Sequence, residues 1–143
     1  MILRKKLITS ILITIILSSV IQVVGNQNKD TTNLEIADIR GGFCRVTAVI
    51  KNVGIVDAEN FSITISVKGG LLNNTNIFHE CSGCDHCQPT IPVNETKSES
   101  TLKSGLIIGF GQIAINVTAE AENADLVKEE AKGFMFGPFV LII

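Results

Sequence analysis

The chain has 143 residues, a formal net charge of −2 and four cysteines, and it contains neither tryptophan nor tyrosine. After residue 25, nine basic side chains stand against 14 acidic ones, a net charge of −5. This balance argues against nucleic-acid binding and against attraction to anionic lipid headgroups. The 118 residues that follow residue 25 are enough for one domain with its own core.

The first 25 residues have the layout of a secretory signal peptide. Arg4, Lys5 and Lys6 form a basic start, residues 7–24 are largely apolar, and cleavage is expected after Gly25. A segment of 18 residues is also close to the minimum for a helix that spans a bilayer, so an uncleaved signal anchor is the alternative. Both interpretations predict export through the general secretory route and a secreted or cell-surface location. Residues 26–33 read as a polar linker.

Four N-x-Ser/Thr sequons are compatible with an exported glycoprotein. Their asparagines are Asn60, Asn73, Asn94 and Asn116.

Residues 34–143 predict an all-β domain. Phe61 to Lys68 alternates most regularly, with Phe61, Ile63, Ile65 and Val67 on one face and polar residues on the other, as in a half-buried antiparallel strand. The same period predicts strands at 34–39, 43–53, 96–104, 111–119 and 133–143. Residues 125–132 fit either a short turn of helix or a charged loop. About seven strands with almost no helix predict an immunoglobulin-like antiparallel β-sandwich, preceded by the N-terminal hydrophobic signal helix.

The run VIKNVGIVDAENFSITISVKGG, residues 49–70, resembles the core of the CARDB domain, an immunoglobulin-like sandwich of prokaryotic surface proteins. The ends of the domain, Gly41-Gly42-Phe43 and Gly133 to Leu141, are also similar to short secreted proteins of archaea. The resemblance spans most of residues 34–143 and implies surface display or adhesion, with no catalytic residues to carry over. One departure is a longer, cysteine-rich insertion at residues 71–92.

The stretch HECSGCDHC, residues 79–87, concentrates the chemically reactive side chains. In an exported domain, four cysteines usually form two disulfides, and every pairing of Cys44, Cys81, Cys84 and Cys87 joins Cys44 to this stretch. Strand parity places Cys44 inward, and the direction of residues 61–68 suggests that Cys44 and the stretch share one end of the domain.

A metal site is the alternative for the same stretch. The C-x2-C-x2-C spacing offers three thiolates to zinc, with Cys44, His79 or His86 as the fourth ligand. A C-x-x-C redox role is the weakest interpretation, because the chain lacks the βαβ setting of thioredoxin-like proteins.

These observations predict a non-enzymatic, exported surface or envelope module for adhesion or structural interaction, without a cofactor. The alternative is a zinc-binding or thiol-redox surface protein that acts through Cys81, Cys84 and Cys87. Expected partners are envelope components or further copies of the chain, with membrane contact only through an uncleaved N-terminal segment. The apolar end FVLII could complete its own sheet or that of a neighbour.

Overall fold

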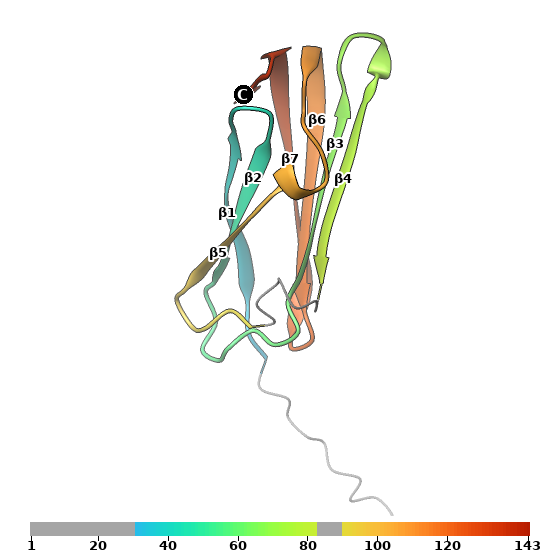
Figure 1. Cartoon of the computed structure of the whole chain (residues 1–143). Helices are drawn as coiled ribbons and strands as arrows, with labels where there is room; N and C mark the ends of the chain where they lie inside the picture. The colour runs from blue at the N-terminus through green and yellow to red at the C-terminus, as the bar shows by residue number, and fades with distance from the viewer. Residues whose placement is uncertain (1–30, 83–89) are drawn as a thin grey trace, which may run out of the picture.

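Two antiparallel sheets packed face to face make up the computed structural model, which describes residues 31–82 and 90–143 (Figure 1). The strands are β1 (Leu34–Gly41), β2 (Val46–Asn52), β3 (Ser62–Gly69), β4 (Thr75–Ser82), β5 (Thr96–Ser100), β6 (Gly109–Ala121), β7 (Ala124–Gly137) and β8 (Phe139–Ile142). Two short 3-10 turns, η1 (Leu71–Asn73) and η2 (Thr101–Lys103), interrupt them. The predicted all-β class is confirmed for these residues. The N-terminal segment of residues 1–25 and most of the linker lie outside the described residues.

No helix within the described ranges has the length and hydropathy needed to cross a membrane.

One sheet has three strands in the order β1-β2-β5, and the other has five in the order β4-β3-β6-β7-β8. The core lies between them, because each central strand turns alternate apolar side chains inward. Ile63, Ile65 and Val67 on β3 are almost fully buried, and so are Ile115 and Val117 on β6. The apolar face predicted for residues 61–68 is therefore confirmed, and so is the strand predicted at residues 111–119.

Three expectations about single elements are corrected. Residues 125–132 are neither helix nor loop, because they continue β7, which pairs with β6 along most of its length. The final segment is two strands rather than one, since the chain reverses at Gly137 and Pro138. Much of the supposed insertion at 71–92 is β4, a regular strand paired with β3 from Thr75 to Ser82.

The two ends of the molecule are formed by different turns. At one end lie the β1–β2, β3–β4 and β7–β8 connections together with the start of β6, and we call this end the tip (Figure 1). At the other lie the β2–β3 and β6–β7 connections, and we call it the base. The 14 residues of β7 run between the two ends, about 46 Å at 3.3 Å per residue.

One long side of the sandwich is closed near the tip. The amide of Val140 on β8 donates to the carbonyl of Gly42 at 3.0 Å, and the amide of Cys44 donates to the carbonyl of Pro138 at 2.6 Å. These bonds join the β1–β2 turn to β8, so the apolar C-terminal segment completes its own sheet and also contacts the opposite one.

Candidate functional site

The structure separates the residues that were expected to form one cysteine cluster. Cys81 is buried near the end of β4, opposite Ile63, and therefore lies toward the base. Cys44 is buried at the tip, with its backbone bonded to Pro138 and Ile107. The expectation that Cys44 and the cysteine-rich stretch share one end is wrong. The chain does leave β3 near Cys44, but β4 then carries it back along the whole domain.

Cys44 has a free thiol, which contradicts the prediction that it bridges to the stretch. A disulfide requires Cα atoms within about 7 Å. From the level of Thr75 to that of Cys81, the extended strand covers about 20 Å. Cys81 is disulfide-bonded. Cys84 and Cys87 lie outside the described residues. His86 also lies outside them.

The distance along β4 also prevents Cys44 and Cys81 from binding the same zinc ion. Within residues 31–82 and 90–143, no group of three or more His, Cys, Asp or Glu side chains is placed to hold a metal ion.

His79 takes part in a buried polar contact between the two sheets. Its side chain is 4% exposed on β4, and its Nδ1 lies 2.8 Å from the Ser104 hydroxyl. Its Nε2 lies 3.7 Å from a carboxylate oxygen of Glu99 on β5, too far for a hydrogen bond. The same carboxylate accepts from Lys103 at 3.4 Å. This cluster ties β4 to β5 where no backbone ladder does, so we assign it a structural role.

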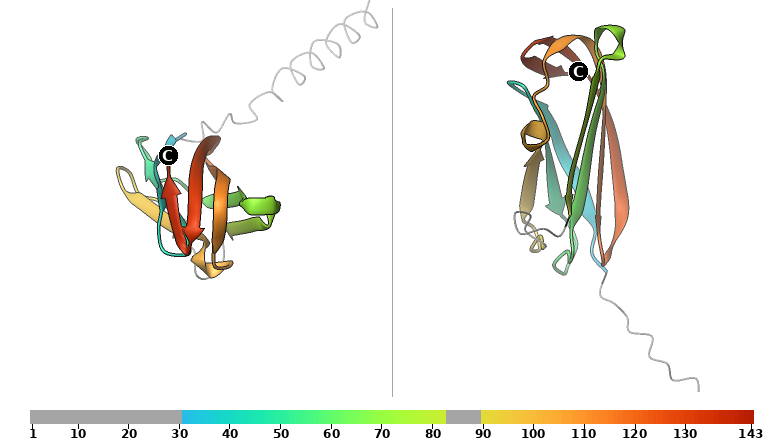
Figure 2. Two further views of the ribbon diagram at one scale, coloured as in Figure 1. Left: turned by 90° about the horizontal axis from the view of Figure 1, so that it is seen from above. Right: turned by 45° about the vertical axis from the view of Figure 1, so that its right-hand side comes forward.

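The largest unusual feature is an exposed apolar surface at the tip. Ten of the 16 large hydrophobic side chains that the described residues expose belong to it. We call this set the apolar tip: Phe43, Leu71, Leu72, Leu106, Ile108, Phe110, Phe134, Phe136, Phe139 and Leu141. Figure 2 looks down on this end and shows the turns gathered around it. Clusters of exposed apolar groups on a monomer commonly mark an interaction site.

Sheet register explains how the phenylalanines come together. Phe110, Phe136 and Phe139 are successive partners across β6, β7 and β8, and Phe43 is bridged to Phe139 from the β1–β2 connection. The rings of Phe110 and Phe136 meet edge to face at 5.2 Å between centroids, and those of Phe43 and Phe139 at 5.7 Å. Edge-to-face contacts at these distances are favourable, so the row is ordered although it faces solvent.

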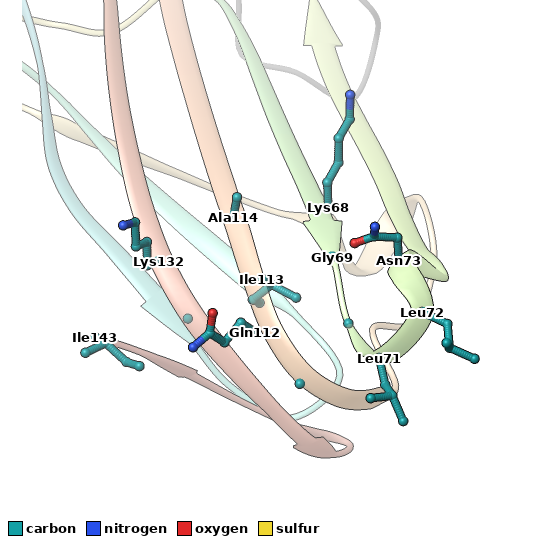
Figure 3. Close-up of a pocket in the computed structure, with 13 residues that line it drawn as sticks. Lys68, Gly69, Leu71, Leu72, Asn73, Gln112, Ile113, Ala114, Lys132 and Ile143 are labelled. Atoms are coloured by element: carbon teal, nitrogen blue, oxygen red, sulfur yellow. The ribbon is translucent and has the colours of Figure 1, made fainter.

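A shallow groove of about 890 Å³ adjoins the apolar tip on the outer face of the five-stranded sheet. Figure 3 shows Leu71 and Leu72 at one side, Ile143 at the other and Ala114 between them. Lys68 and Lys132 flank Ala114 in the same row of the sheet. The apolar tip is therefore followed, toward the base, by a row that carries two cations.

Three of the four sequons lie in turns at the ends of the molecule, and the fourth lies within β6. Asn60 and Asn94 are exposed in connections toward the base, and Asn73 is exposed in η1 at the tip. All three have positive φ angles, which asparagine tolerates in turns. Asn116 lies in β6 on the outer face and is half-buried.

No family model and no curated protein matches this chain. The apolar tip itself was not predicted from the sequence. The signal was present in Gly133-Phe-Met-Phe-Gly137, where Met135 points inward and Phe134 and Phe136 therefore point outward.

Proposed function

We propose that this chain is an exported, non-enzymatic module of the cell surface or envelope, and that it makes adhesive or structural contacts. In this proposal the two-sheet domain is an immunoglobulin-like sandwich of the CARDB type, delivered by the signal segment at residues 1–25. The fold is a scaffold, and contacts with partners depend on the residues at its surface.

The observation that carries the proposal is the exposed apolar tip. Phe136 is 62% exposed and Phe110 is 54% exposed, although both belong to strands whose inward side chains are buried. Exposed phenylalanine is unfavourable in water, since burial of such a side chain contributes about 1.5–3 kcal/mol. A row of four phenylalanines from two sheets is explained if another surface covers it.

The experiment compares binding of the exported protein to envelopes prepared from cells that do not make it. Phe110→Ser combined with Phe136→Ser removes two rings from the apolar tip. Phe78→Ser is the matched control, because Phe78 is 58% exposed on the same outer face but lies on β4, away from the tip. We expect the double variant to bind at least about tenfold more weakly, as expected when central aromatic contacts are removed. The control should bind like the wild type.

All three proteins are exported and recovered in the same way and begin at the same residue, so the difference in binding between them isolates the tip. Equal binding by the double variant and the wild type would remove the basis of the proposal. Export itself is tested by the intact mass of the recovered protein, which we expect to begin at Asn26.

A further inference from the structure

The connections at the two ends of the molecule differ in chemistry. At the tip, the β3–β4 connection exposes Leu71 and Leu72, and the segment before β6 exposes Leu106 and Ile108. At the base, the β2–β3 connection exposes Asp57 and Glu59 beside the apolar Val53 and Ile55. The β6–β7 connection exposes Glu122, and the start of β7 exposes Asp125 beside Leu126. Turns that face water usually carry polar residues, as the acidic side chains at the base do. The apolar turns therefore suit an environment other than water.

Charged side chains are also distributed differently between the tip and the base. Arg45, Lys68 and Lys132 lie at the tip or in the row behind it, and none of them has an ion-pair partner among the described residues. Asp38, an exposed carboxylate near this end, is paired with Arg40. The net charge of −5 after residue 25 is therefore unevenly distributed. Unpaired cations lie toward the tip, Glu129 and Glu130 lie two to three residues from Lys132 on the side of the base, and the acidic turns lie at the base itself.

We propose that the apolar tip inserts into the interface of a lipid bilayer that contains anionic headgroups. The inference rests on the proposed function and names the component of the envelope that the tip contacts. Side chains from several separate turns project from one end of the molecule, and a fluid bilayer can accommodate such an end without a shaped partner.

The spacing of the rows fits this occupant. Lys132 lies four residues before Phe136 on β7, about 13 Å along the strand. With the phenylalanine row at the boundary between headgroups and acyl chains, Lys68 and Lys132 reach the level of the phosphates, where lysine is favoured. The acidic base stays in water. This proposal differs from the expectation drawn from net charge alone, because it considers where the charges lie.

A fluorescence experiment tests insertion directly. The chain has no tryptophan, so Phe136→Trp in the full-length protein provides a single indole at the tip, and Phe78→Trp provides one on β4, outside it. Vesicles consist of phosphatidylcholine with phosphatidylglycerol in equal parts. We expect the emission of the tip indole to shift to shorter wavelength when vesicles are added and that of the β4 indole to stay unchanged. The N-terminal segment cannot produce this difference, because both proteins carry it.

Three results overturn the inference. Emission of the tip indole that does not respond to vesicles excludes insertion. A shift that occurs without lipid and grows with protein concentration assigns the tip to a second copy of the chain. An equal shift of both indoles places the whole face, and not the tip, at the membrane.

The contribution of the two lysines to vesicle binding is tested with Lys68→Gln combined with Lys132→Gln. We expect binding to the anionic vesicles to fall by about fivefold for each lysine, and binding to pure phosphatidylcholine vesicles to change little. An unchanged affinity for anionic vesicles contradicts the electrostatic part of the inference. The two proposals can also be separated. If the protein does not bind vesicles, but Phe110→Ser combined with Phe136→Ser still weakens its binding to envelopes, the proposed function is supported and the lipid bilayer is excluded as the partner of the tip.

Discussion

Gly41 on β1 lies directly against the carbonyl of Val140 on β8. A Cβ atom built on Gly41 would be 2.1 Å from that carbonyl oxygen, well inside van der Waals contact. The neighbouring Gly42 has room, since its nearest atoms belong to the flexible side chain of Arg45 at 3.6 Å. The absence of a side chain at Gly41 is what allows the two sheets to meet near the tip.

Gly41→Ala should therefore destabilise the domain, and Gly42→Ala should not. A methyl group at residue 41 has to displace backbone, for which we expect a loss of about 2 kcal/mol in the free energy of unfolding. Chemical denaturation of both variants measures this. Similar stability for the two would mean that the contact between β1 and β8 is looser than described.

The part of the fold that could be predicted depends on apolar alternation. β3 and β6 show it because their inward residues are mainly Ile and Val. Both strands were therefore predicted correctly. β4 was missed because its buried positions include Thr75, His79 and Cys81, which do not read as apolar. Only pairing with β3 reveals the strand.

β7 was misread for a related reason. Between Asp125 and Lys132 only Val127 and Ala131 are apolar and partly buried, so the sequence shows charge rather than a period of two. The strand is imposed by its long ladder with β6. The apolar tip and the separation of Cys44 from Cys81 depend in turn on which connections share an end, and alternation alone does not supply that information.

His79 and Glu99 should be energetically coupled across the sheets. We expect a double-mutant cycle with His79→Leu and Glu99→Gln to give a coupling energy of about 0.5 kcal/mol or more, as for buried polar neighbours. Equilibrium unfolding of the four proteins provides the cycle. A coupling near zero would show that the 3.7 Å approach between Nε2 and the carboxylate contributes nothing to the packing of β4 on β5.

Cys44 should be protected in the native protein and free once it unfolds. Its side chain is 4% exposed, so an alkylating reagent should not reach it under native conditions. In denaturant without reductant, peptide mass spectrometry should find the label on Cys44. An unlabelled Cys44 after denaturation would restore the disulfide that the sequence suggested.

Glycosylation of the sequons should differ between the tip and the base. A glycan on Asn73 would stand beside Leu72, which is 92% exposed at the tip, and would keep the turn away from a bilayer. We therefore expect Asn73 to be unmodified, and any glycans to be found at Asn60 and Asn94 toward the base. Peptide mapping of the exported protein reads this out. Full occupancy of Asn73 is incompatible with an inserted tip.

The central claim is that the apolar tip is the contact surface of this domain. Hydrogen–deuterium exchange of the unmodified protein, with and without vesicles of phosphatidylcholine and phosphatidylglycerol, tests it most directly. The account predicts slower exchange in the connections at residues 42–45, 70–74 and 105–109, and no change at residues 53–60 and 121–124. Protection at the base, or no protection at the tip when the protein is bound, would contradict it.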